Sequence, residues 1–360
     1  MSAREPPEPD DYIDYYISYL EKRKAPGTVV CNQNALANLR EYLQNNNQSA
    51  DELTADDVEL FFEKLKSSGL EENTAGAYAG CVQRFYDYYS TRGTFETNPA
   101  AIALENTDFD KHRNPVRREI SQVEMGDFLA DVTRPQPQAI CMLLAKTGIR
   151  ASELINLDVR DVHLDHPSFK KVEEPRGEIS GRPDTIFVPS SIRAGEEYNG
   201  EVREKGNKRE RDTIIPIDTE LKKSLLRHYL TKLESPHQDD DRAQRTGEAE
   251  PLFYQRLGYR SKRVIGERAT QDGVWRLLKD LGEPRGWYKV GGSAEENVTA
   301  HYFRHWFTTQ AEQEGIPRPV VKYIRGDVGS DIVDKHYRHF WGDEVKEEYL
   351  SNIYYFGIYD

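Results

Sequence analysis

The spacing of apolar residues changes once along this chain, and the change divides it into two parts. Over residues 10–95, apolar and aromatic residues recur at the three- and four-residue intervals of a helix face. They form four segments separated by short turns, and the third begins with a capping box made by Thr54 and Asp57. We therefore predict a small helical bundle over residues 8–104.

A different pattern begins after the polar stretch 105–118, which we predict to be a linker. A second capping box, Ser121 with Glu124, opens a helix-rich region. Two β-type runs, 185–188 and 213–217, predict an elaborated hairpin. Residues 119–345 should thus form a mixed α+β domain, mainly helical with a small hairpin sheet, followed by a carboxy-terminal tail over 346–360.

Composition excludes several classes of protein. The 360 residues are 37% hydrophobic, which is enough to fold and excludes a disordered acidic chain. Three isolated cysteines favour neither a disulfide scaffold nor a zinc ribbon, and we expect no metal and no cofactor. The chain contains neither a long apolar run nor a signal peptide, so we expect a cytoplasmic protein without a membrane span.

The net charge of −13, from 62 acidic and 49 basic residues, argues against binding to phosphate-rich partners. An excess of carboxylates with Arg outnumbering Lys also suits a very salty cytoplasm, where charge repulsion is screened within a few ångströms. Such a composition would fit a protein of a halophilic archaeon or of one of its mobile elements. Local basic sites could then still bind nucleic acid.

Three segments carry side chains suited to phosphate chemistry. The first, TGIRASEL, places an arginine at a helix start, the second is a basic turn before a β run, and the third, HYFRH, lies in the first turns of a helix. Their polar residues are Arg150 with Glu153, Lys205 with Lys208, and His301 with Arg304. Each segment alone is more often a cap, a hairpin tip or a structural helix face, but their order and combination are uncommon.

In this order the segments resemble the motifs of the tyrosine recombinase (phage integrase) family, which includes the Xer-type recombinases. The resemblance implies that Arg150 and Arg304 bind phosphate, and that Glu153 supports Arg150. It also implies that His301 is catalytic and that Lys205 is the catalytic lysine. Lys208 stays open as the alternative lysine, because the long separation of Arg150 from Lys205 implies an insertion around 170–199.

The segment GDVGSDIVDKHY resembles the family's nucleophile segment and implies Tyr337 as the nucleophile. Tyr323 reads as a core residue, and the tyrosines of the tail suit packing onto a neighbouring subunit; the tail tyrosines are Tyr349, Tyr354, Tyr355 and Tyr359. A zinc pair of His301 and His305 is disfavoured, because Tyr302 stands where an HExxH motif has its glutamate.

One position departs from the family pattern. The family usually has His or Trp in a glycine-led box before the nucleophile, and here Asp327 follows Gly326. An ionised carboxylate cannot donate a hydrogen bond to phosphate. The role is therefore lost, altered, or taken by a neighbour such as His336.

The resemblance implies a site-specific recombinase that cleaves and rejoins double-stranded DNA through a 3′-phosphotyrosine, as a tetramer on paired sites. The helical bundle would be the core-binding half of a DNA clamp. Two other functions stay open: a decayed relative that binds DNA without cleaving it, and a monomeric DNA-relaxing topoisomerase. Basic residues expected to contact DNA are Arg113, Arg117, Arg118, those within 203–211, Arg256, Arg260, Lys262, Arg263 and Arg268.

Overall fold

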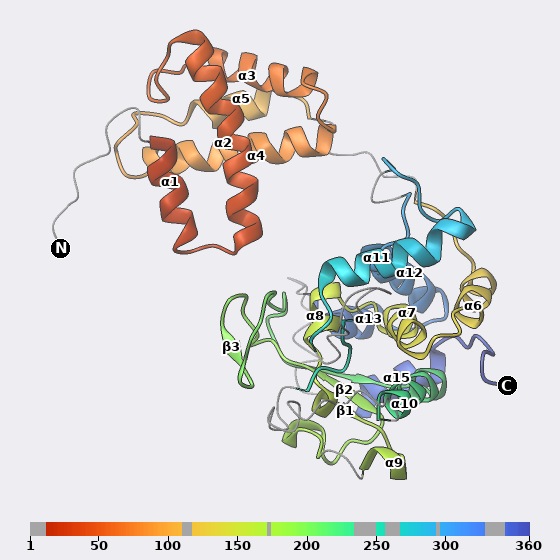
Figure 1. Cartoon of the computed structure of the whole chain (residues 1–360). Helices are drawn as coiled ribbons and strands as arrows, with labels where there is room; N and C mark the ends of the chain where they lie inside the picture. Colours follow the sequence, from red (N-terminus) through yellow and green to blue (C-terminus); the bar gives the residue numbers. More distant parts are fainter. Residues whose placement is uncertain are drawn as a thin grey trace, which may run out of the picture. The chain divides into compact units, whose positions relative to one another are not determined.

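The computed structural model describes residues 12–109, 117–170, 174–233, 250–255, 267–292, 296–327 and 343–360. The chain divides into two compact units, residues 1–114 and 115–360. Figure 1 shows a helical first unit and a second unit in which helices surround a small antiparallel sheet. The fold class predicted from the sequence is confirmed.

The first unit contains the helices α1 (Tyr12–Glu21), α2 (Pro26–Asn46), α3 (Ala55–Ser67), α4 (Glu72–Ser90) and α5 (Pro99–Asn106). The predicted capping box opens α3, because the Thr54 hydroxyl accepts from the Asp57 N–H. Helix α5 was not predicted. The Asn98–Pro99 pair starts this helix: the Asn98 side chain accepts from the Ala101 N–H, and proline fits the first helical position.

Aromatic side chains form much of the core of this unit. Tyr12, Phe85, Tyr89 and Phe95 are buried and pack mainly edge to face. The buried Tyr89 hydroxyl donates to the Tyr12 carbonyl at 2.7 Å, so the one polar group of this side chain has a hydrogen-bond partner. These tyrosines are therefore packing residues, as the sequence pattern predicted.

The second unit is built around α7 (Pro135–Thr147), whose residues from 136 onward are all buried. Helices α10 (Thr219–Leu233) and α12 (Ala300–Gln313) pack against it. The remaining elements are α6 (Gln122–Asp131), α8 (Ala151–Asn156), η2 (Val159–Asp161), α9 (Pro167–Lys170), η3 (Gly177–Ile179), α11 (Gln271–Gly282), η5 (Glu283–Arg285), α13 (Arg318–Arg325) and α15 (Asp343–Asn352).

The sheet has the strand order β1 (Val162–His163), β2 (Thr185–Val188), β5 (Thr213–Pro216), all antiparallel. Ile186 lies opposite Ile215, and both side chains are fully buried. A second hairpin, β3 (Glu197–Tyr198) with β4 (Glu201–Val202), is inserted between β2 and β5. The predicted elaborated hairpin is thus confirmed, and the insertion positions the segment that carries Lys205.

The carboxy-terminal segment is part of this unit's own core, which corrects the prediction for two tail tyrosines. Tyr349 and Tyr354 are buried, and their hydroxyls donate to the carbonyls of Lys146 and Ala145 in α7. They therefore do not pack onto a neighbouring subunit. The Lys146 ammonium, also fully buried, donates to the Tyr354 carbonyl and pairs with Asp218 at 2.7 Å and Glu220 at 2.8 Å.

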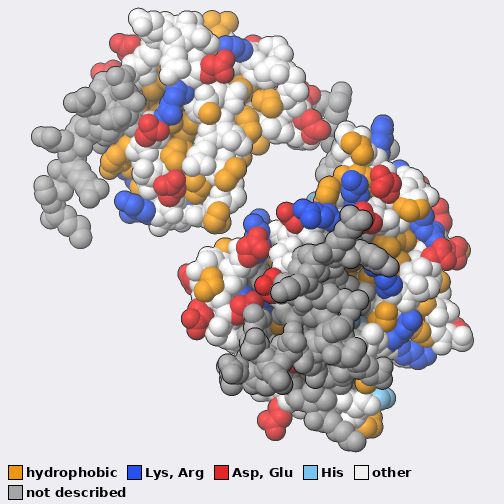
Figure 2. All heavy atoms as spheres, viewed as in Figure 1, with side chains coloured by type: hydrophobic (Ala, Val, Ile, Leu, Met, Phe, Trp, Pro, Cys, Tyr) orange, Lys and Arg blue, Asp and Glu red, His pale blue; other side chains and the backbone are white. Residues whose placement is uncertain are grey.

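Charge is mixed rather than segregated on the visible surface. On the face shown in Figure 2, acidic and basic side chains are interspersed over both units. None of the described helices combines the length and apolar character needed to cross a membrane.

We expect Lys146→Met to cost about 3–5 kcal/mol of unfolding free energy, because it leaves two buried carboxylates without their cation. Urea denaturation followed by circular dichroism measures this loss. Lys222→Met is the matched control: its pair with Asp184 is partly exposed, so we expect a loss of about 1 kcal/mol or less. Equal losses in the two variants would contradict this account of the buried pair.

Candidate functional site

Arg150 is positioned by the turn between α7 and α8. Gly148 ends α7 with a φ of +58°, and a Cβ there would lie 2.7 Å from the Phe307 ring, so the turn requires glycine. Glu153 Oε2 accepts from the Arg150 backbone N–H at 2.9 Å, and Oε1 accepts from Arg150 Nη1 at 3.0 Å. One buried carboxylate thus fixes both the backbone and the guanidinium of Arg150.

Arg304 reaches the same place from α12. Its Nη1 donates to the carbonyls of Gly148 at 2.7 Å and Arg325 at 2.9 Å, and the residue is only 4% exposed. Burial, together with the charges of Arg150 and Arg325, lowers the pKa of Arg304 to about 10, so it remains a cation at neutral pH. Two arginines from distant segments therefore meet, as the resemblance implied.

Asp327 lies at the point where these arginines meet. Its Oδ1 accepts from Arg150 Nη2 at 3.1 Å and from Arg304 Nη2. Its Oδ2 lies 3.1 Å from Arg325 Nη2. Helix α13 positions this carboxylate, because the helix ends at Arg325, Gly326 caps it with a φ of +69°, and Asp327 follows directly. The residue that departs from the family pattern is thus the shared acceptor of three guanidiniums.

Arg209 is the last member of a charged cluster that also contains Arg150, Glu153, Arg304, Arg325 and Asp327. Its Nε lies 3.1 Å from Glu153 Oε1, and its Nη2 donates to Glu153 Oε2 at 3.1 Å and to the Ile324 carbonyl at 3.0 Å. A Cβ at Gly326 would lie 2.7 Å from this guanidinium. Burial acts to raise the pKa of Glu153, but Arg209 and Arg150 outweigh it and hold that pKa below its ordinary value.

Arg209 and Arg325 were not predicted from the sequence as parts of this cluster. Arg209 was grouped with basic residues expected to contact DNA, yet its side chain is buried. Its proximity to Lys208 and to the start of β5 was the only available signal. Arg325 stands just before the Gly326–Asp327 pair, but nothing in its local sequence indicates that it pairs with Asp327.

Two further arginines expected to contact DNA are also structural. The Arg203 side chain is fully buried and donates to Asp158 Oδ2 at 2.8 Å. Arg268 pairs with the same buried Asp158 at 2.5 Å and with Glu201 at 2.8 Å. Since both charges are already neutralised inside the protein, they hold the β3–β4 hairpin to the end of α8 rather than face a partner.

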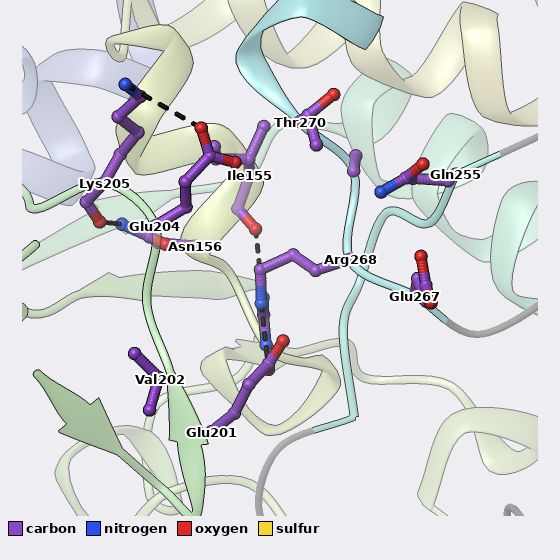
Figure 3. Close-up of a pocket in the computed structure, with 11 residues that line it drawn as sticks. Ile155, Asn156, Glu201, Val202, Glu204, Lys205, Gln255, Glu267, Arg268 and Thr270 are labelled. Atoms are coloured by element: carbon purple, nitrogen blue, oxygen red, sulfur yellow. Dashed lines mark hydrogen bonds and ion pairs between the residues drawn. The ribbon is translucent and has the colours of Figure 1, made fainter. Parts of the chain in front are cut away.

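Lys205 lies on the rim of a cavity of about 290 Å³ beside this hairpin (Figure 3). Its carbonyl accepts from the Asn156 side chain at 2.8 Å, while its Nζ extends to 3.8 Å from Glu204. The backbone at Lys205 is therefore fixed, while its side chain is 44% exposed. Lys208 is exposed. The hydrogen-bond partners of Arg150 and Arg304 given above include neither lysine.

His301 is exposed near the start of α12, and its Nε2 lies 2.9 Å from Nε2 of His305. Burial, followed by the charge of Arg117, lowers the pKa of His305 to about 4, so this ring is neutral near pH 7. Among the described residues no group of three or more His, Cys, Asp or Glu side chains is arranged to hold a metal ion.

Tyr337 and His336 lie outside the described residues, as do Arg113, Arg256, Arg260, Lys262 and Arg263. Tyr323 is buried and its hydroxyl accepts from the Ile214 N–H at 3.1 Å, which confirms it as a core residue.

Comparison with protein families assigns both parts of the chain. Residues 129–341 match the model of the phage integrase family, and residues 11–106 match the phage integrase SAM-like domain. The chain belongs to the phage integrase family.

Curated relatives of this integrase-family protein extend over most of its length. It is 23% identical to tyrosine recombinase XerD and 29% identical to tyrosine recombinase XerC of Oceanobacillus iheyensis, covering 94% and 95% of this chain and 95% of each relative. It is 24% identical to tyrosine recombinase XerA of Pyrococcus furiosus, covering 76% of this chain and 72% of that relative.

Solved structures share the fold. The Tn1549 transposon integrase in complex with transposon right end DNA matches with a TM-score of 0.62 and 16% identity, over 93% of this chain and 96% of that one. A lambda integrase dimer bound to a core site matches with a TM-score of 0.56 and 14% identity, over 93% of this chain and 78% of that one.

We expect Arg209→Met to lower the unfolding free energy by about 3–5 kcal/mol, because Glu153 loses its buried partner. The pKa of Glu153 should rise in this variant, since Arg209 is the largest influence that lowers it. Glu153 would then be protonated more easily, and the stability gap to the wild type should narrow as the pH falls toward 4.5, the ordinary value for Glu.

Urea denaturation at several pH values measures both effects. Arg193→Met removes an exposed arginine and serves as control, with an expected change within about 0.5 kcal/mol. A gap that stays constant with pH would show that Arg209 does not act through Glu153.

Proposed function

We propose that this protein is a site-specific DNA recombinase that cleaves and rejoins duplex DNA through a 3′-phosphotyrosine intermediate. Family membership and the tyrosine recombinases among its relatives support this proposal. The observation that carries it is the convergence of Arg150 and Arg304, from segments far apart in the sequence, on one carboxylate oxygen, Oδ1 of Asp327.

The arginine pair would bind the scissile phosphate. A pentavalent phosphorane carries extra negative charge on its non-bridging oxygens, and guanidinium forks can bind this charge without losing a proton. Glu153 and the carbonyls of Gly148 and Arg325 hold the two guanidiniums in place before DNA arrives. Such fixed donors need no rearrangement as the transition state forms, which is how they would lower its free energy.

Proton transfer would fall to residues around this pair. The Tyr337 hydroxyl, with an ordinary pKa near 10, would attack phosphorus in the local positive potential, with His301 as the proton acceptor. The leaving deoxyribose 5′-oxygen needs a proton, which the ammonium of Lys205, or alternatively Lys208, would supply. The covalent phosphotyrosine conserves the bond energy, so rejoining would require neither ATP nor a metal.

The alternative of a decayed, non-cleaving relative is less well supported. The Asp327 substitution motivated it, but both arginines are present and held in place. The matched relatives are also recombinases over nearly the whole chain. A topoisomerase has no specific observation in its favour.

We expect Tyr337→Phe to abolish covalent protein–DNA adducts on a nicked suicide substrate, because the nucleophilic oxygen is missing. DNA affinity should stay within about threefold of the wild type, since the phenol contributes little to binding. Denaturing gel electrophoresis detects the adduct, and a mobility shift measures affinity.

Tyr355→Phe is the matched control, because Tyr355 is an exposed tyrosine of the carboxy-terminal segment and its loss should leave adduct formation intact. An adduct that survives in Tyr337→Phe would assign the nucleophile to another residue. No adduct even in the wild type would favour the non-cleaving relative.

We further infer that the protein acts as a tetramer on paired DNA sites, in the cytoplasm, where the DNA of a prokaryotic host lies.

The matched relatives named above do not indicate a halophilic archaeal source, and only the acidic composition supports that inference. Adduct formation that persists in molar salt would support a salty host, and an optimum in dilute buffer would contradict it.

A further inference from the structure

We propose that the Asp327 carboxylate is an internal substitute for the DNA phosphate, which it keeps from the arginine pair until DNA displaces it. This inference rests on the proposed function, because it assumes that Arg150 and Arg304 bind the scissile phosphate. It gives Asp327 a role in setting how strongly the site binds phosphate.

Asp327 occupies the N–H groups that a bound phosphate would need. The Nη1 groups of both arginines are already committed: that of Arg150 to Glu153, and that of Arg304 to the carbonyls of Gly148 and Arg325. The Nη2 groups of both turn to Asp327 Oδ1. Asp327 therefore takes the same side of the guanidinium pair that an incoming anion would have to use.

The Asp327 carboxylate is also chemically similar to the group that would replace it. A carboxylate and a phosphodiester each carry one negative charge and offer two oxygens to guanidinium forks. Both cannot occupy the Nη2 groups together, since two anions in hydrogen-bond contact with the same donors repel one another in a partly buried site. Phosphate binding is thus a replacement of one anion by another.

The arginine cluster requires an anion when DNA is absent. Arg304 is buried beside two other guanidiniums, Arg150 and Arg325, whose charges act against its own protonation. Asp327 acts in the opposite direction on both Arg304 and Arg325. Without Asp327, the DNA-free protein would hold these three guanidiniums close together beside Glu153, whose charge is already paired with Arg209.

The carboxylate also has a way out. Asp327 keeps 27% of its side chain exposed, so rotation of the side chain can bring it to solvent. Its backbone need not move: the Asp327 N–H donates to the Lys322 carbonyl at 3.0 Å as part of the turn that ends α13. Arg325, held by its hydrogen bond to Thr308 at 2.6 Å, already pairs with Oδ2 and can retain the displaced carboxylate.

The first test uses inorganic phosphate and needs no DNA cleavage. Asp327→Asn keeps the shape of the side chain and removes its charge. We expect this variant to unfold at a lower temperature than the wild type in chloride buffer, and added phosphate to raise its midpoint well beyond the rise seen in the wild type. Asp131→Asn, an exposed change of the same charge, is the control and should respond to phosphate like the wild type.

The second test uses a short duplex at fixed salt concentration. Asp327→Asn should bind it about tenfold more tightly than the wild type, because no internal anion has to be displaced. The Asp131→Asn control should change affinity by less than about twofold.

Equal or weaker DNA binding by Asp327→Asn, or a phosphate response no larger than that of the wild type, would overturn the inference and show that Asp327 stays on the arginines when phosphate binds. The proposed function fails separately. If Asp327→Asn gains phosphate and DNA affinity while the wild type forms no adduct on the nicked substrate, the anion replacement stands and the recombinase activity does not.

Discussion

The site depends on one buried carboxylate. Glu153 accepts from the guanidiniums of Arg150 and Arg209. It also caps the first turn of α8, because its carboxylate accepts from the Arg150 backbone N–H. A buried ion of this kind is tolerated only when its oxygens are satisfied by opposite charges and hydrogen bonds. Because both partners are arginines with fixed planar forks, satisfying Glu153 also fixes where the Arg150 guanidinium points.

This arrangement connects elements that are distant in the sequence. Arg209 leads into β5 and also donates to the Ile324 carbonyl in α13, while the Arg325 carbonyl next to it accepts from Arg304 in α12. The strand, the two helices and the α7–α8 turn are therefore held by one network of charged hydrogen bonds. A displacement of any of these elements would shift the guanidiniums of Arg150 and Arg304, since these groups share acceptors.

A second network performs the same task for the lysine-bearing segment. Asp158 pairs with Arg203 and Arg268. The Asn156 side chain donates to both the Lys205 carbonyl and Asn207, so replacing Asn156 would remove both hydrogen bonds. In both networks, arginine side chains are buried and paired with carboxylates inside an acidic protein. The number of basic residues available to contact a partner is therefore smaller than the sequence suggests.

Local features determined what the sequence could tell. Helical periodicity, the Thr54 and Ser121 capping boxes and the β-type runs depend on neighbouring residues, so they indicated the helical first unit and the mixed second unit correctly. Motif order indicated Arg150 and Arg304. The tertiary structure alone decided that Arg209 is buried against Glu153, that Asp327 lies on three guanidiniums, and that Tyr349 and Tyr354 pack into their own chain. These outcomes depend on contacts between residues far apart in sequence, where burial and pairing of charge override the polar character of each residue taken singly.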